Sequence, residues 1–346
     1  MNDHHKTFIA FVKLGGFLRD YCNLQQSVDP WSKKLDEAVA LAKHKNGWFT
    51  SENVLHALQN WGELLTEEQL SAWLGEYDLN QNRPKTVALI LAGNIPLVGF
   101  HDFLSVLITG NRALVKLSSN DDVLLSFIGE YLIHIEASLE PKIRFEKERL
   151  QNFDAVIATG SNNTSRYFEH YFGKGPNIIR KNRNSVAVLT GNESEAQLKA
   201  LGEDIFRYYG LGCRSVSKVF VPKDYDFDLL FKSLYAYADI IDHKKYANNY
   251  DYNKAVYLMS DFNILDNGFL ILKEDQGYAS PIASLFYERY DSTAELKNRL
   301  ENEREQLQCI VSEGFYPTET GFGKTQKPSL PDYADDIDTV DFLLKT

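Results

Sequence analysis

A single cysteine on a short glycine-flanked turn has the clearest potential for covalent chemistry in this chain. Cys213 ends the segment Gly210-Leu211-Gly212-Cys213, between a predicted helix at 193–208 and an apolar run at 216–221 that is typical of a strand. A thiol on such a turn is open to a substrate, and the amide N–H of Cys213 could point at a developing oxyanion. We interpret Cys213 as a nucleophile. The alternative is a small buried hydrophobic residue, which is a common role of free cysteine.

Polar residues also follow several other apolar runs. Asn94, in Gly93-Asn94-Ile95-Pro96, could donate its side-chain amide to a reacting carbonyl oxygen, or could stabilise its own turn. Lys116 ends a strand-like run and can reach a ribose or a phosphate, unless it is simply solvated. Thr159-Gly160-Ser161 lies where a strand passes into a helix, so free backbone N–H groups could hold a pyrophosphate or serve only as a cap. The usual Gly-x-Gly-x-x-Gly fingerprint is absent after the first strand.

The elements that must position these residues alternate between strands and helices from residue 85 onward. Such alternation predicts an α/β fold with a doubly wound, Rossmann-type parallel sheet, in which ligands bind at the carboxyl ends of the strands. Asn94, Lys116 and Gly160 all fall at such ends. The predicted strands are 86–92, 113–116, 155–158, 177–180 and 185–189, and the predicted helices are 97–108, 121–135 and 162–172.

The rest of the chain predicts a helical start and a second α/β unit. Residues 1–80 show helical spacing, and Thr66-Glu67-Glu68-Gln69 has the form of a capping box. A length of 346 residues exceeds what one core usually supports. The predicted elements of the second unit are strands at 216–221, 269–272, 281–287 and 308–311, helices at 226–237 and 294–306, and a polar, tyrosine-rich stretch at 243–257. We expect N-terminal helices and a cofactor-binding domain at 1–191, a catalytic domain at 192–330 and a separate C-terminal segment at 331–346.

The C-terminal segment carries an apolar pattern that has no obvious place in either domain. Val340, Phe342 and Leu343 alternate with polar neighbours, which predicts a strand. A free apolar strand favours pairing with another subunit. We therefore expect a C-terminal oligomerisation strand in a homodimer or tetramer.

Charge and cysteine content exclude several classes of function. The balance of 37 Lys and Arg against 48 Asp and Glu gives a net charge of −11, which argues against nucleic acid or an anionic membrane as the main partner. Three widely spaced cysteines indicate neither a disulfide framework nor a Cys-rich zinc site, and they fit a reducing cytoplasm. We expect no metal, no signal peptide and no membrane span, because the apolar runs fall far short of about 20 residues.

Other polar groups have simpler interpretations. His4 and His5 are most simply solvated tail residues, and His101-Asp102 suits helix capping or packing better than catalysis. A cluster of basic residues is interpreted as a solvated face, with contact to an anionic cofactor as the alternative. Its members are Lys174, Arg180, Lys181 and Arg183.

Five motifs, in this order, resemble the aldehyde dehydrogenase superfamily and most closely its LuxC-type acyl-CoA reductase branch. They run from about residue 85 to the end of the chain. They are Gly93-Asn94-Ile95-Pro96, the segment 109–119, Thr159-Gly160-Ser161, Gly210-Leu211-Gly212-Cys213, and 322–328 with Asp332-Tyr333-Ala334-Asp335.

The resemblance implies a nicotinamide cofactor and a nucleophilic role for Cys213. It also implies that Asn94 and the Cys213 amide form the oxyanion hole, that Lys116 contacts the cofactor ribose, and that the C-terminal strand bridges subunits. Glu274 is similar to the superfamily glutamate that holds the nicotinamide ribose. The further cofactor contacts that we expect are Ser118, Ser119, Thr159, Gly160 and Ser161.

Two departures from the superfamily pattern bear on the reaction. Hydrolytic aldehyde dehydrogenases carry Glu-Leu-Gly-Gly, whose glutamate activates water, where this chain has Arg183-Asn184-Ser185-Val186. Without that base a thioester on Cys213 should hydrolyse slowly and persist for hydride or an incoming thiol. Ser119 stands where NAD-preferring relatives often place a glutamate. A serine does not repel a 2′-phosphate, so NADPH is permitted and NADH stays possible.

We therefore expect NADPH-dependent reduction of an acyl thioester, with a fatty acyl group, to an aldehyde through a thioester on Cys213. The donor is an acyl-CoA, with CoA as leaving group, or an acyl-protein, and an acyl-protein synthetase is an expected partner. Two alternatives stay open. One is an NAD-dependent aldehyde dehydrogenase that produces acids, and the other is a non-catalytic subunit that carries an acyl group.

Overall fold

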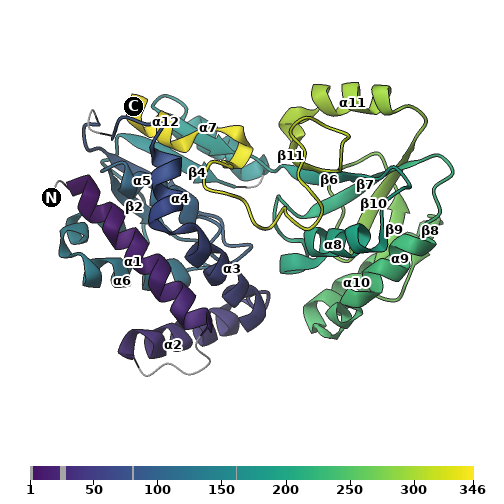
Figure 1. Cartoon of the computed structure of the whole chain (residues 1–346), viewed down its shortest axis with the longest axis horizontal. Coiled ribbons are helices and arrows are strands. Elements are labelled where there is room, and N and C mark those ends of the chain that lie inside the picture. The colour runs from purple at the N-terminus through teal and green to yellow at the C-terminus, as the bar shows by residue number, and fades with distance from the viewer. Residues whose placement is uncertain (1–2, 24–28, 80–81, 161) are drawn as a thin grey trace. The chain divides into compact units, whose positions relative to one another are not determined.

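The computed structural model describes residues 3–23, 29–79, 82–160 and 162–346, and the chain divides into two compact units (Figure 1). The first unit contains Met1–Asn182 and Ser329–Thr346, and the second contains Arg183–Pro328. Each unit has its own sheet and its own hydrophobic cores. Among the helices that the structure describes, none has the length and apolar composition that crossing a bilayer requires.

The first unit is built on five parallel strands. They are β1 (Thr86–Ile90), β2 (Arg112–Lys116), β3 (Ile143–Phe145), β4 (Ala155–Thr159) and β5 (Asn177–Arg180). Their spatial order is β3-β2-β1-β4-β5, which is the Rossmann order. Successive strands are added on one side of β1 up to β3 and on the other side from β4 onward, so the strand order switches between β1 and β4. Ile90 is in register with Lys116 on one side and with Ala158 on the other, so the carboxyl ends of these strands align at one edge.

Helices cover both faces of this sheet, because successive side chains of a strand point to opposite sides. The helices are α1 (Asp3–Asn23), α2 (Pro30–Lys45), α3 (Ser51–Leu64), α4 (Glu67–Leu74), α5 (Phe100–Ile108), α6 (Leu124–Ile135), α7 (Asn162–Phe172) and α12 (Thr339–Lys345). Val87 and Leu89 of β1 pack into the core that includes α1, α5 and α6. Ala88, between them, faces the cluster that contains Phe168 and Phe172 of α7.

The second unit contains a six-stranded sheet in the order β11-β6-β7-β10-β9-β8. Its strands are β6 (Asn184–Val188), β7 (Val216–Pro222), β8 (Ile264–Asp266), β9 (Ile271–Glu274), β10 (Ser284–Tyr290) and β11 (Leu307–Val311), and its helices are α8 (Glu195–Phe206), α9 (Asp228–Leu234), α10 (Lys244–Met259) and α11 (Thr293–Asn302). All neighbours are parallel except β8, which pairs antiparallel with β9. Val219 and Val221 of β7 face the core with α8 and α9, and Phe220 faces the core with α11.

The C-terminal residues form a helix, so the predicted terminal strand is wrong. Asp338 caps α12 by accepting the N–H of Asp341 at 2.8 Å. Val340 and Leu343 are three residues apart, lie on one side of the helix, and are buried in the core of the first unit beside α5. Seven residues are too few for apolar spacing to separate a strand from a helix. These side chains are buried within their own chain, so the prediction that a C-terminal strand bridges subunits is also wrong.

The boundary between the units also differs from the expected one. The second unit begins at Arg183, whereas the sequence placed the boundary after residue 191. The reason is that β6 pairs with β7 and β11 and therefore belongs to the second sheet. Residues 329–346 return to the first unit, where the Trp73 Nε1–H donates to the Tyr333 hydroxyl at 2.7 Å.

The tyrosine-rich stretch that the sequence left without an assigned structure is the helix α10. Its buried residues are Tyr246, Tyr250, Asn253 and Tyr257, at spacings that place them on one side of a helix. The Tyr246 hydroxyl donates to the carbonyl oxygen of Phe269 at 3.0 Å. Aromatic side chains with a polar tip form this apolar face, which is why ordinary hydrophobic periodicity does not reveal it.

Candidate active site

A strained segment leads from α8 into the turn that carries Cys213. Tyr208 and Tyr209 have φ angles of +55° and +59°, and Gly210 has a φ angle of +76°. For residues other than glycine this left-handed region costs about 1–2 kcal/mol each. The Tyr209 ring stacks on His243 with the ring centroids 4.3 Å apart, and Tyr208 is buried. Packing therefore holds the segment in this conformation, as expected for strain at a functional site.

Cys213 lies on a four-residue turn, 212–215, immediately before β7. The turn is closed by the Ser215 N–H, which donates to the Gly212 carbonyl oxygen at 3.0 Å. The Gly212 N–H in turn donates to the Ser215 hydroxyl oxygen at 3.3 Å. Cys213 is exposed, so the interpretation of this residue as a small buried hydrophobe is wrong. Its nucleophilic role stays a prediction.

Ser185 of β6 holds the backbone of this turn. Its hydroxyl donates to the carbonyl oxygen of Cys213 at 2.8 Å and accepts the N–H of Cys309 at 3.1 Å. The Ser185 side chain is fully buried. Sequence reasoning placed residue 185 at the start of a strand and noted the glutamate that the segment lacks, but it missed this contact.

The segment 322–328, one of the five motifs quoted above, also contacts the Cys213 turn. The Gln326 side-chain amide donates to the Ser215 hydroxyl oxygen at 3.2 Å. The preceding loop is held by the buried carboxylate of Asp204 in α8, which accepts the N–H and hydroxyl of Thr325 at 2.9 and 2.8 Å and the N–H of Gly323 at 2.6 Å. Burial raises the pKa of Asp204 to about 6 in spite of these hydrogen bonds. A motif quoted above only for its resemblance thus braces the cysteine turn.

The other two cysteines lie in different surroundings. Cys309 of β11 is buried, and its Sγ lies 3.6 Å from the Arg214 guanidinium, which donates to it. Cys22 of α1 lies in the first unit, where burial, and to a lesser degree Glu63, raises the pKa of its thiol to about 11. Of the three cysteines, all within the described residues, Cys213 is the exposed one. It is therefore the thiol most open to an acyl donor.

Glu274 lies in the same unit as Cys213, but its strand β9 is separated from β7, which follows the Cys213 turn, by β10. It ends β9 and is in register with Tyr287 of β10, which is in register with Val219 of β7. Two strand spacings correspond to about 10 Å across the sheet, and Cys213 precedes the first residue of β7. The predicted contact of Glu274 with the cofactor ribose therefore gains no support from this placement.

The remaining predicted site residues gather at the carboxyl edge of the first sheet. Asn94 follows β1, Lys116 ends β2 and Thr159 ends β4. The strand order reverses between β1 and β4, and α/β sheets bind ligands at such a switch point. Tertiary structure thus brings together residues that are up to 65 positions apart (Thr159 minus Asn94) in the sequence.

The loop after β2 lies against the loop after β1. Lys116 is half-buried, and its Nζ donates to the Glu148 carbonyl oxygen at 3.0 Å. Ser118 packs on Gly93, where a Cβ atom would lie 2.7 Å from the Ser118 Cβ. Ser119 is exposed. Lys116 and Ser119 are therefore accessible from solvent, whereas Ser118 also has a packing role.

The turn after β4 leads directly into α7. A Cβ atom on Gly160 would lie 3.0 Å from both Thr164 and Phe168, so a larger residue would force these neighbours to move. The Gly160 N–H donates to the Arg180 carbonyl oxygen at 3.4 Å and extends the sheet. The start of a helix such as α7 is a common place for an anion to bind. Ser161, the third residue of the predicted motif, lies outside the described residues.

The basic residues near the end of β5 do not form one solvated face, and that prediction is wrong. Arg180 is buried and forms an ion pair with the buried carboxylate of Asp102. Lys181 is exposed and pairs with Glu169 at 2.8 Å. Arg183 belongs to the second unit. The Asp102 contact confirms a packing role for the start of α5.

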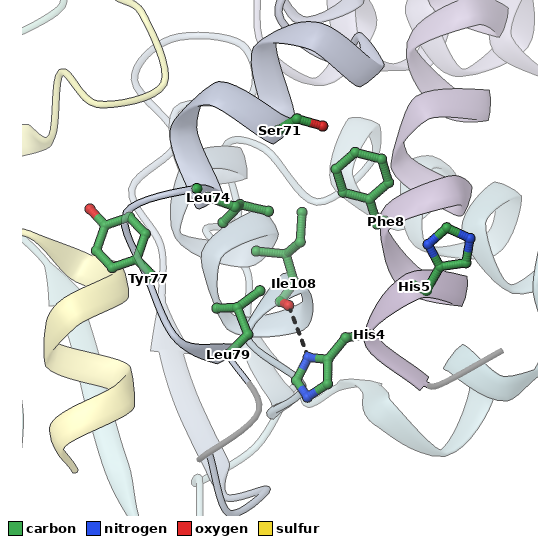
Figure 2. Close-up of a pocket in the computed structure, with 9 residues that line it drawn as sticks. His4, His5, Phe8, Ser71, Leu74, Tyr77, Leu79 and Ile108 are labelled. Carbon is green, nitrogen blue, oxygen red and sulfur yellow. Dashed lines mark hydrogen bonds between the residues drawn. The ribbon is translucent and has the colours of Figure 1, made fainter.

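A surface pocket of about 390 Å³ lies at the opposite, amino edge of the first sheet (Figure 2). It is lined by residues of α1, by residues of α4 and of the segment that follows it, and by Ile108 at the end of α5. The His4 Nδ1 donates to the Ile108 carbonyl oxygen at 3.4 Å, so His4 is not the solvated tail residue that we expected. As far as the structure describes them, the lining residues include none of the predicted site residues. The pocket is therefore separate from the candidate active site.

Comparison with solved structures defines the class of fold. Aldehyde dehydrogenase 21 from Physcomitrella patens superposes with a TM-score of 0.68 over 100% of this chain and 84% of that one, at 11% identity. An indole-3-acetaldehyde dehydrogenase, solved in complex with NAD+, gives a TM-score of 0.64 over 90% of this chain and 72% of that one, at 12% identity. The chain therefore has the aldehyde dehydrogenase fold. At these identities the likeness concerns the fold alone.

Sequence comparison then defines the family. The family model described as acyl-CoA reductase (LuxC) matches residues 30–230, which are 201 of the 346 residues and include both Asn94 and Cys213. The chain belongs to this acyl-CoA reductase (LuxC) family.

Two curated relatives carry more specific names. The long-chain acyl-protein thioester reductase of Aliivibrio fischeri is 24% identical over 246 residues, covering 65% of this chain and 50% of the relative. The long-chain acyl-protein thioester reductase 2 of Photobacterium leiognathi is 24% identical over 254 residues, covering 66% and 52%. This chain thus spans about half the length of the curated relatives that it matches.

Proposed function

We propose that this protein reduces a long-chain acyl thioester to the corresponding aldehyde, with NADPH as reductant and Cys213 as the residue that accepts the acyl group. The observation that carries the proposal is the exposed Cys213 on a turn braced by Ser185 and Gln326, through Ser215, in a chain of the LuxC family. The names of the curated relatives support an acyl-protein donor, and the family description supports an acyl-CoA donor. For an acyl-protein donor, the reaction also requires a synthetase that forms the thioester.

In the proposed reaction the Cys213 thiolate adds to the acyl carbonyl carbon. The bond to the donor sulfur breaks, and the donor thiolate leaves and takes up a proton. A bound reduced nicotinamide supplies the hydride for the thioester on Cys213. The resulting thiohemiacetal anion breaks its C–S bond, releases the aldehyde and regenerates the Cys213 thiolate. One thioester and one proton are consumed per hydride, and one aldehyde and one free thiol are released.

The oxyanion of both tetrahedral species needs donors that are already in place. In the proposal these donors are the Asn94 side-chain amide and the Cys213 N–H, and one such donor is worth about 10²–10³ in rate. Both donors are neutral, so they favour a charge that appears only in the transition state. Ser185 cannot serve as a base for hydrolysis, because its hydroxyl is buried and donates to the Cys213 carbonyl oxygen.

The carboxyl edge of the first sheet suits a dinucleotide. Lys116 would contact the ribose, Ser118 and Thr159–Gly160 would line the binding edge, and the start of α7 would face the pyrophosphate. Gly160, which precedes α7, has no side chain that would lie between the pyrophosphate and the backbone. Ser119 carries no charge that would repel a 2′-phosphate, so it permits NADPH as the proposed reductant.

The proposal is tested by intact-mass analysis after incubation with acyl-CoAs of defined chain length. We expect a mass increase of one acyl group, and aldehyde release with oxidation of NADPH when the cofactor is added. Cys213→Ala should abolish both, while Cys22→Ala, which removes a thiol of raised pKa in the other unit, should abolish neither. Acylation that persists in Cys213→Ala would contradict the proposal. An acid product would instead support an aldehyde dehydrogenase, and acylation without NADPH oxidation a carrier.

A further inference from the structure

The loop that carries Asn94 has an unusual backbone conformation at its far end. Leu97 has a φ angle of +58°, a left-handed conformation that is unfavourable for a leucine. Its side chain is buried, and its carbonyl oxygen accepts the N–H of Phe100 at 3.0 Å as α5 begins. Such a conformation persists where the surrounding structure fixes it. Asn94 itself is exposed.

The Asp121 side chain supplies one of the constraints on Leu97. Its Oδ2 accepts the Leu97 N–H at 3.3 Å, although Asp121 lies 24 residues further along the chain. Asp121 is 7% exposed. Burial raises the pKa of this carboxyl group to about 7, against the opposing effect of the N–H groups of Leu97 and Leu124. A carboxyl group is thus kept buried where it meets the backbone of the Asn94 loop.

The backbone of Asp121 has a different contact. Its N–H donates to the carbonyl oxygen of Ser118 at 3.1 Å, and Ser118 belongs to the loop that follows Lys116. Removing the Asp121 side chain therefore leaves the bond to Ser118 in place. The side chain thus acts on Leu97 and on the start of α6, whereas the backbone N–H bonds the loop that follows Lys116.

We propose that Asp121 is a positioning residue for Asn94. By accepting the Leu97 N–H, Asp121 keeps Leu97 in its left-handed backbone conformation and thereby holds the loop that carries Asn94. The inference rests on the proposed function, in which Asn94 donates to the oxyanion. A donor of this kind must be held to within a fraction of an ångström, and a displacement of 1 Å can cost about 10²-fold in rate. Asp121 touches neither the acyl group nor the cofactor in this role.

Steady-state kinetics of side-chain variants provide the first test. Asp121→Ala and Asp121→Leu, which cannot accept the Leu97 N–H, should lower kcat about 10- to 100-fold and leave the KM for NADPH within about twofold. Asp121→Asn keeps an acceptor oxygen and should recover kcat to within about threefold of the wild type. The matched control is Asp122→Ala, because Asp122 is an adjacent carboxylate that pairs with Lys45 on the surface at 2.8 Å. It should behave as the wild type.

A double variant separates positioning from general damage. If Asp121 acts through Asn94, then Asp121→Ala adds no further loss of kcat once Asn94→Ala is present. Independent, multiplicative losses in the double variant would overturn the inference. So would an active wild type whose kcat is unchanged by both Asp121→Ala and Asp121→Leu.

Amide hydrogen exchange gives a readout that needs no activity. Exchange in the segment 93–99 should accelerate at least about tenfold in Asp121→Ala and Asp121→Leu, and stay at the wild-type rate in Asp121→Asn and Asp122→Ala. This pattern in an inactive wild type would contradict the proposed function while supporting the constraint on the loop. Unchanged exchange in both acceptor-less variants would overturn the constraint itself.

Discussion

The hydroxyl oxygen of Ser185 lies 2.8 Å from the carbonyl oxygen of Cys213 and 3.1 Å from the amide nitrogen of Cys309. One buried hydroxyl thus connects the turn of the candidate nucleophile to β6 and β11. The thiol is exposed, but the backbone that carries it is held by the sheet. An accessible group on a supported backbone is what a nucleophile in covalent catalysis requires.

Replacement of Ser185 by alanine should slow acylation of Cys213 about tenfold, because the turn loses its bond to β6. It should also lower the free energy of unfolding by about 1–3 kcal/mol, since the buried Cys309 N–H and the partly buried Cys213 carbonyl lose their partner. The acylation rate is measured by intact mass against time, and stability by denaturant titration. Ser233→Ala is the matched control, since Ser233 is also buried and its hydroxyl donates to the Leu229 carbonyl oxygen at 2.8 Å in α9. Equal acylation rates in the two variants would reduce Ser185 to a structural role.

The stability contributed by Asp204 should decrease as the pH rises. Burial raises its pKa from 3.8 to about 6 in the folded protein, so between these values the folded state binds more protons than the unfolded state. This contribution is fully present below about pH 4, falls as the pH rises to about 6, and is constant above that. The difference in free energy of unfolding between the wild type and Asp204→Asn should therefore fall by roughly 2–3 kcal/mol from pH 4 to pH 7. Denaturant titrations at several pH values measure it.

The control for removal of a charge is Asp224→Asn, an exposed carboxylate of the same unit. A difference for Asp204→Asn that instead grows with pH would mean that the hydrogen bonds from Gly323 and Thr325 outweigh the cost of burying the charge.

Introduction of a carboxylate at residue 119 should select against NADPH. Ser119→Glu should raise the KM for NADPH at least about tenfold, by repulsion of the 2′-phosphate, and change the KM for NADH by less than about threefold. Ser119→Gln has the same size without the charge and should keep the wild-type preference. Initial rates with the two cofactors provide the measurement. If both variants bind NADPH equally well, the 2′-phosphate does not lie beside residue 119.

Much of the α/β architecture was predictable from the sequence, because strands buried on both faces are continuous apolar runs that local pattern reveals. The runs that became β1, β2, β4, β5 and β7 were each placed to within a few residues. The capping residue Thr66 was also recognised, and its hydroxyl accepts the Gln69 N–H at 3.2 Å. Such features depend on neighbours in the chain.

The errors occur where local pattern is ambiguous. Val340, Phe342 and Leu343 fit a strand as well as a helix, and the cap at Asp338 with the core around α5 decided for the helix. Arg180 was grouped with surface cations, since nothing in its neighbours indicates the buried carboxylate of Asp102, which lies 78 residues away. The charge of Arg180 is evident in the sequence, but its pairing with Asp102 is evident only in the structure.

The order of the elements, the turn that carries Cys213 and the motifs of the LuxC family can all be recognised in the residues before any coordinates are known. The long-range hydrogen bonds that support the Cys213 turn appear only in the folded chain. Ser185 bonds Cys213 across 28 residues, and Asp204 bonds Thr325 across 121. A hydrogen bond between remote residues forms only when the sheets and loops that carry them have packed together. A short stretch of sequence influences its own backbone conformation, but it does not specify which distant residues will contact it.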